Sequence, residues 1–212
     1  GISIEALFEK VDQALYEAKA RGKDQCIIWN EQLSKGTSKT KNKLAGIITG
    51  RPVEDSRNIL TFVELIQLIN KNIPYKEKIY QFLGRSIEIS GSMIGCLLFV
   101  NDKMISEKYC RLAHKEEWVR NISHNEKIIQ EVIKTGRGSC QVDWDDIGRQ
   151  DLLTGLPYWD SIIAVPITLN NKIEAILYYS VSTKIKEFSE DEYNLISVLS
   201  NLIPSLIINK KA

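Results

Sequence analysis

Hydrophobic residues recur at i, i+3, i+4 and i+7 along much of the chain, and this spacing predicts amphipathic helices. The helical segments are residues 4–21, 58–70, 75–89, 125–135 and 189–208. Gly22 and Gly136 follow two of them, as glycine often does after the last helical turn. Ser189 and Glu192 have the spacing of a capping box at the start of the last helix, in which Pro204 predicts a kink.

Shorter apolar runs between these helices predict strands. They cover residues 25–29, 91–100, 105–113, 161–169 and 173–181. Asn101-Asp102 predicts a turn, and Asn170-Asn171 predicts a two-residue hairpin loop because asparagine tolerates positive φ. Helices and strands together predict one α/β domain over residues 58–208.

The chain changes character before that domain. Residues 1–31 hold one helix and one strand, which cannot close a core alone. Residues 32–57 are rich in Gly, Ser, Thr and Lys, and no acidic residue lies between Gln32 and Arg51. We interpret this stretch as a linker. The alternative is a basic run that contacts phosphates, but it lacks the interleaved aromatic residues that stack on bases.

The composition is that of an ordinary globular protein. The chain has 212 residues, 43% of them hydrophobic, and its 28 basic and 27 acidic residues leave a net charge of +1. This excludes a mainly disordered chain and argues against a nucleic-acid partner. There is no apolar run of membrane-spanning length and no signal-peptide pattern, and the four cysteines are widely spaced. We therefore expect reduced thiols, a cytoplasmic location and no membrane contact. Gly1 in place of an initiator Met indicates an excised piece of a longer protein.

Residues 11–24, Val-Asp-Gln-Ala-Leu-Tyr-Glu-Ala-Lys-Ala-Arg-Gly-Lys-Asp, resemble the last helix and following turn of GGDEF domains, the diguanylate cyclase module. Val11 and Asp24 depart from the usual Ala and Asn. The resemblance implies that residues 1–31 are the C-terminal helix-strand remnant of such a domain. The catalytic GGDEF turn is absent from the sequence, so we expect this chain not to be an enzyme, although its parent protein could be a diguanylate cyclase that makes cyclic di-GMP.

Residues 151–157, Asp-Leu-Leu-Thr-Gly-Leu-Pro, match the opening motif of a GGDEF domain. However, residues 158–160 lead directly into the strand predicted from Ser161, and no GGDEF turn follows. We interpret this match as coincidence.

Four short motifs between residues 58 and 208 resemble GAF domains and occur in the order of that family. They are Val132–Gly136 with Val142-Asp143, Ser161–Ile167, Ile173–Leu177 and Phe188–Glu192. In the third motif, Glu174 replaces the usual Gly. The resemblance implies an α+β fold with an antiparallel sheet flanked by helices on both faces, in a bacterial sensory domain that binds a small ligand or forms dimers.

The resemblance also implies a ligand between the sheet and the irregular segment before the strand 161–169, here residues 138–160. Aromatic side chains and an arginine in this segment could stack on and pair with a planar or anionic ligand. The alternative is that the segment folds over its own core and fills the pocket. Cyclic nucleotides and bilins are not favoured, because the motifs of the GAF domains that bind them are incomplete or missing. The candidate ligand-binding residues are Trp144, Arg149, Tyr158 and Trp159.

We expect no metal and no cofactor. Cys110, His114 and His124 are the nearby soft ligands, but a zinc site needs further ligands at tighter spacing. An acidic cluster predicts a helix N-terminus or a solvated turn rather than a calcium site, because the EF-hand pattern is absent. That cluster consists of Asp143, Asp145 and Asp146.

The helices 58–70 and 189–208 have more apolar surface than one sheet face needs. We therefore expect a homodimer through these helices, with packing inside one chain as the alternative. The main hypothesis is a sensory GAF domain that regulates a linked GGDEF module. Its rivals are a ligand-free protein-interaction module and a diguanylate cyclase fragment.

Overall fold

The computed structural model divides the chain into two compact units, Gly1–Lys43 and Leu44–Ala212. The residues that it describes are 10, 14, 28–30, 46–113, 122, 124–144 and 160–211. In the first unit, Lys10 and Ala14 are helical, and the Lys10 ammonium lies 4.1 Å from the centre of the Trp29 ring, a cation–π contact. The rest of the GGDEF-like segment lies outside the described residues, so the structure leaves that resemblance as a prediction.

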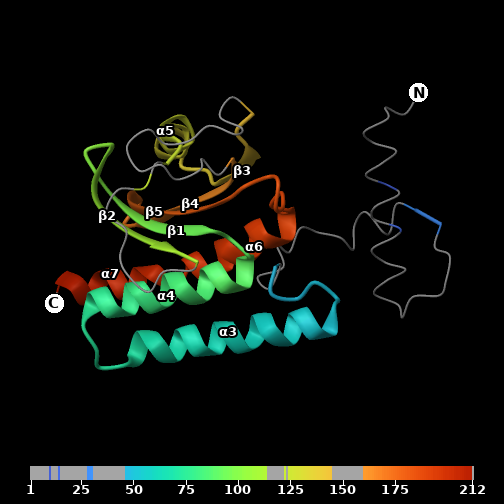
Figure 1. Ribbon diagram of the computed structural model, residues 1–212, viewed down its shortest axis with the longest axis horizontal. Helices are drawn as coiled ribbons and strands as arrows, with labels where there is room; N and C mark the ends of the chain where they lie inside the picture. Colours follow the sequence, from blue (N-terminus) through green and yellow to red (C-terminus); the bar gives the residue numbers. More distant parts are fainter. Residues whose placement is uncertain are drawn as a thin grey trace. The chain divides into compact units, whose positions relative to one another are not determined.

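A five-stranded sheet forms the centre of the second unit (Figure 1). All neighbouring strands are antiparallel, in the order β2-β1-β5-β4-β3. The strands are β1 (Ile94–Asn101), β2 (Met104–Leu112), β3 (Ser139–Val142), β4 (Ser161–Leu169) and β5 (Lys172–Val181). Four of them were expected, and the antiparallel sheet flanked by helices confirms the predicted fold class.

Two tight turns join these strands. Asn170 and Asn171 both have positive φ between β4 and β5, which confirms the predicted hairpin. The first turn lies one residue later than predicted, because Asn101 still pairs with Met104 and the residues with positive φ are Asp102 and Lys103. The strand β3 was missed, since four residues carry too short a pattern to be recognised before β4 is in place beside them.

Five helices accompany the sheet in the described residues. They are α3 (Pro52–Asn70), α4 (Tyr75–Ser90), α5 (Glu126–Thr135), α6 (Glu190–Ser200) and α7 (Ile203–Lys211). The predicted helix 189–208 is thus two helices, and Pro204 lies in the first turn of α7, where its missing N–H costs little. The capping box of Ser189 and Glu192 is confirmed. None of the described helices is long and apolar enough to cross a membrane.

The helix α3 begins six residues before the predicted position 58. Pro52 at its first turn favours that start, and Asp55 accepts hydrogen bonds from the backbone N–H groups of Thr49 (2.6 Å) and Gly50 (3.1 Å). Just before it, Ile47 is buried, and Asn58 donates to its carbonyl oxygen at 3.2 Å. The described end of the predicted linker is therefore part of the fold of the second unit.

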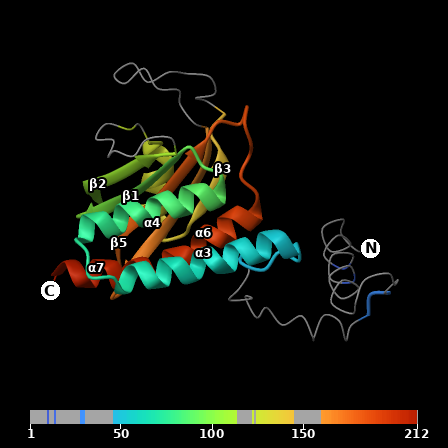
Figure 2. The same ribbon diagram turned by 60° about the horizontal axis from the view of Figure 1, so that its bottom comes forward.

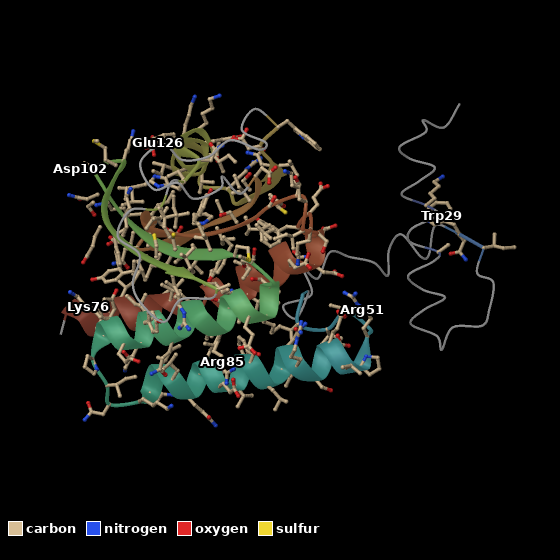
Figure 3. All side chains as sticks on the ribbon, in the orientation of Figure 1. Trp29, Arg51, Lys76, Arg85, Asp102 and Glu126 are labelled. Carbon is tan, nitrogen blue, oxygen red and sulfur yellow. The ribbon has the colours of Figure 1, made fainter. Side chains whose placement is uncertain are left out.

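The helices cover the two faces of the sheet unequally (Figures 1 and 2). On one face lie α4, α6 and α7, with α3 packed outside α4. Arg85 of α4 reaches towards α3 and pairs with Glu64 at 3.1 Å (Figure 3). On the opposite face the described residues place a single helix, α5. We call the two surfaces the α4 face and the α5 face.

Side-chain alternation along the strands divides the hydrophobic core accordingly. The core of the α4 face includes Leu97, Leu177 and Tyr179, with buried residues of all four helices on that side. Gly95 lets α4 approach β1, because a Cβ there would lie 2.8 Å from the Tyr179 ring and 2.9 Å from Ile87. A second, smaller core on the α5 face includes Ile94, Cys96, Leu98, Ile176 and Tyr178, packed against Ile128, Ile129 and Val132 of α5.

Candidate functional site

Tyr178 is the polar centre of an otherwise largely apolar α5 face. Its side chain is buried, and its hydroxyl accepts a hydrogen bond of 3.2 Å from the backbone N–H of Asn125. Burial raises the pKa of Tyr178 well above its usual value, so the hydroxyl keeps its proton. The ring of His124 packs edge-on against the ring of Tyr178, with centroids 6.3 Å apart.

Asn125 joins three elements at this point. Its Oδ1 accepts from the backbone N–H of Ile128 at 3.0 Å, which caps the N-terminus of α5. Its Nδ2 donates to Oδ2 of Asp143, which directly follows β3. Because its backbone N–H also binds Tyr178 of β5, the start of α5, the end of β3 and the middle of the sheet meet at one residue.

His124 adds a neutral imidazole to the same cluster. Burial lowers its pKa below the usual value, and the positive charge of Lys108 lowers it further, whereas Glu126 opposes the shift. Its Nε2 lies 2.9 Å from Oε2 of Glu126. Hydrogen bonds to Glu126 and to the backbone of Ile122 also oppose the shift in pKa, and they hold the ring in place.

The residues on either side of the segment 145–159 are held close together. The backbone N–H of Asp143 donates to the carbonyl oxygen of Asp160 at 2.7 Å. Asp160 is buried, and its carboxylate accepts hydrogen bonds of 2.8 Å from the backbone N–H and from the hydroxyl of Thr183, just after β5. Asp143 is also bonded to Asn125. The residues on either side of the segment 145–159 therefore lie next to the polar cluster.

Of the four predicted site residues, the structure describes only Trp144. It follows β3, and 71% of its surface is exposed. Arg149, Tyr158 and Trp159 lie outside the described residues, so this site stays a prediction. The prediction did not include Tyr178 or Asn125. The sequence did contain a signal for Tyr178. Tyr178 and Tyr179 are consecutive in a strand, so their side chains must point to opposite faces of the sheet, and one tyrosine is expected on each face.

The described residues contain no group of three or more metal-binding side chains. Cys110 is buried next to Cys96, and His114 lies outside the described residues. Asp143 of the acidic cluster is engaged by Asn125, while Asp145 and Asp146 are not described.

One groove lined by described residues alone lies away from the α5 face, along α3 and α4. It has a volume of about 520 Å³ and is lined by side chains of both charges, including Glu64, Arg85 and Arg111. Arg111 is used in packing, because it donates to the carbonyl oxygen of Tyr80 at 2.9 Å and lies 4.0 Å from the centre of its ring. A Cβ on Gly84 would collide with this guanidinium. The groove therefore offers mixed charge and no convergent binding group.

A scan against protein-family models gives no match, and a search of the curated proteins gives none either. Solved structures do resemble the chain. The GAF domain of a phosphoenolpyruvate-protein phosphotransferase from Coxiella burnetii has a TM-score of 0.56 at 14% identity, covering 74% of this chain and 96% of that one. The A. aeolicus nlh2 GAF domain in an inactive state has a TM-score of 0.51 at 14% identity, covering 74% and 99%.

An enzyme is among the similar structures. The free methionine-R-sulfoxide reductase of Neisseria meningitidis, in complex with its substrate, has a TM-score of 0.51 at 9% identity, with 71% of this chain and 89% of that one covered. At such identities the likeness shows the fold alone, and the described second unit has the fold of GAF domains. Since this fold is found both in GAF domains and in a reductase, function has to be argued from the site.

Proposed function

We propose that the second unit is a sensory domain of a signalling protein, which binds a small ligand between the α5 face and the segment 145–159. The observation that carries the proposal is the cluster of Tyr178, His124 and Asn125 at the base of that segment. A few convergent polar groups on an apolar surface are typical of small-molecule sites. The shared fold with GAF domains supports the same function.

The described residues favour a ligand with an apolar or planar body. The α5 face around Tyr178 is an aliphatic core, in which side chains such as Leu98 and Ile176 are fully buried, so the edge of this core would offer dispersion contacts but no hydrogen bonds. The tyrosine hydroxyl would orient a polar edge of the ligand, next to the ring of His124. In this proposal Trp144, Tyr158 and Trp159 stack on the ligand, and Arg149 pairs with an anionic group.

The proposed output is regulation of a GGDEF module, of which residues 1–31 would be the C-terminal remnant. This rests on the sequence resemblance of residues 11–24. The cytoplasmic location expected from the sequence belongs to the same proposal. A ligand can shift the linked module only if it binds the two states of the domain with different affinity. Turnover of GTP by this chain would contradict the proposal and favour a cyclase fragment.

Ligand binding is tested on the purified 212-residue chain. We expect native mass spectrometry to show a bound small molecule that is released on denaturation. Trp144→Ala and Arg149→Gln should each lower its occupancy, whereas Met104→Ala, a change at an exposed apolar residue on β2, should not. Absence of any bound molecule, together with no ligand-induced rise in Tm across a metabolite library, would overturn the ligand site.

A second candidate function is homodimerisation, and one surface favours it. The outer side of α3 exposes an apolar patch of Ile59, Leu60, Val63 and Ile66, which are 39–63% exposed. By contrast, Leu195, Leu199 and Leu206 of α6 and α7 are buried within the chain. The proposed dimer therefore uses α3 rather than both predicted helices.

Light scattering over a range of concentrations tests this dimer. We expect the mass to rise from one chain to two, and Leu60→Glu to hold it at one chain. Met104→Glu, a charge at an exposed apolar residue far from α3 in sequence, should leave the dimer intact. A mass of one chain at every concentration would exclude the interaction module in this form.

A further inference from the structure

Two cysteines face each other across the first two strands of the sheet. Cys96 of β1 is directly opposite Cys110 of β2 in the antiparallel register. Both belong to the core of the α5 face, where they are 1% and 2% exposed, and both are free thiols. On its other side, Cys96 is directly opposite Tyr178 of β5, so the pair lies beside the polar cluster.

The backbone places these thiols within bonding reach. Directly opposite residues of antiparallel strands have Cβ atoms about 4.5–5.5 Å apart, close to the separation that a disulfide requires. The two thiols are near enough to hydrogen bond with each other. A disulfide between them would need only a small local adjustment of β1 and β2, with no rearrangement of the sheet.

The position of the pair also provides a route for an oxidant. Among the described strands, β2 lies at the edge of the sheet, with β1 as its only neighbour. Local opening at an edge costs less than global unfolding, because fewer contacts are lost. Cys110 is therefore the thiol reached first, while Cys96 lies one strand further in.

We propose that Cys96 and Cys110 form a reversible cross-strand disulfide, with a peroxide as the oxidant. The Cys110 sulfur attacks the O–O bond of hydrogen peroxide, which breaks to give a sulfenic acid and one water molecule. The Cys96 sulfur then attacks the sulfenic sulfur, the S–O bond breaks, and the hydroxyl leaves as a second water with the Cys96 proton. The two thiols are oxidised and the peroxide is reduced.

This inference goes beyond the proposed ligand site and does not depend on it. Burial raises the pKa of the Cys96 thiol, and the nearby Cys110 sulfur raises it further. Cys96 is therefore not the sulfur that the peroxide oxidises first, and it gives up its proton only as it attacks the sulfenic sulfur of Cys110. Once formed, the bond would tie the edge strand covalently to the rest of the sheet.

The test uses the full chain with Cys26→Ser and Cys140→Ser, so that only the pair remains. After treatment of the folded protein with hydrogen peroxide, we expect intact mass spectrometry to show a loss of about 2 Da, the mass of two hydrogen atoms. Peptide mapping should link the Cys96 and Cys110 peptides, and dithiothreitol should restore the mass. The oxidised form should also unfold at a higher temperature than the reduced form.

The matched control adds Cys110→Ser to the same background. It should show no loss of 2 Da and no reversible change in Tm on treatment. An unchanged mass in the two-cysteine protein, or stable addition of oxygen without a linked peptide, would overturn the proposal. Both proteins are first checked for cooperative unfolding, so that a folding defect is recognised before peroxide is added. If Cys110→Ser does not fold, Cys110→Ala takes its place as the control.

Discussion

The two faces of the sheet differ in what their side chains do. On the α4 face, three helices lie directly on the strands, and the buried Tyr179 hydroxyl is paired with the Ser86 hydroxyl of α4 at 2.6 Å. On the α5 face, the described residues provide one helix of ten residues, and Tyr178, His124 and Asn125 gather at its N-terminus. One face is a large closed core, whereas the other carries the polar cluster on which the proposed ligand site rests.

The largest expected effect is on the α4 face. Phe82 is fully buried in that core, so Phe82→Ala should lower the free energy of unfolding by about 3–5 kcal/mol through lost burial and a residual cavity. Urea denaturation measures this change. Met104→Ala at an exposed site is the control, and its effect should stay within about 0.5 kcal/mol. Similar losses in both variants would contradict the assignment of this face as the main core.

A second effect on the same face comes from the close approach of α4 to β1. Gly95→Ala should cost about 1–3 kcal/mol, because the added Cβ meets the Tyr179 ring and Ile87. The double variant with Ile87→Ala gives a sharper result. If the clash is real, the two changes together cost less than the sum of the single changes. If the losses of unfolding free energy measured by chemical denaturation simply add, α4 moves away from the added Cβ without cost and the clash is not real.

Tyr178 and Tyr179 allow a direct comparison of the two faces by the same chemical change. Tyr178→Phe leaves the Asn125 N–H without its acceptor and should cost about 1–3 kcal/mol. Tyr179→Phe should cost only about 0.5–1.5 kcal/mol, since the Ser86 hydroxyl still donates to the Phe82 carbonyl oxygen. Calorimetry of both variants measures the difference. A larger loss of stability for Tyr179→Phe than for Tyr178→Phe would contradict the hydrogen bond between the Asn125 N–H and the Tyr178 hydroxyl.

The smallest expected effect is a pH dependence from His124. Its pKa is lowered in the folded protein relative to the ordinary value of 6.5, so the unfolded chain binds more protons between the two values. The contribution to stability is therefore complete above about pH 6.5 and is lost as the pH falls through the folded pKa. We expect the Tm of the wild type to fall more between about pH 7.5 and pH 5.5 than that of His124→Gln. Equal slopes in the two proteins would exclude this role for His124.

Local signals in the sequence predicted most elements of the fold. The helix of residues 126–135, the Asn170-Asn171 hairpin and the Ser189 capping box depend on neighbouring residues, and all three are confirmed. The errors have physical causes outside the local pattern. β3 is a strand because β4 lies beside it, and the predicted last helix breaks into α6 and α7 at Asn201–Leu202.

The candidate site was predicted only in part, because its residues come from separate parts of the chain. Trp144, Arg149, Tyr158 and Trp159 were proposed from one continuous segment and remain a prediction. Asn125, Asp143 and Tyr178 have no sequence relation to one another, and hydrogen bonds between α5, β3 and β5 bring them together.

The order of apolar and polar residues alone therefore determined most helices and strands, because periodicity decides which side of each element is buried, whereas the antiparallel class of fold was implied by the resemblance to GAF domains. The tertiary structure decided which face of the sheet each helix covers, and it placed Cys96 opposite Cys110 and Tyr178 beside Asn125. These contacts depend on strand order and register, which arise from pairing between distant segments and leave no trace in local spacing.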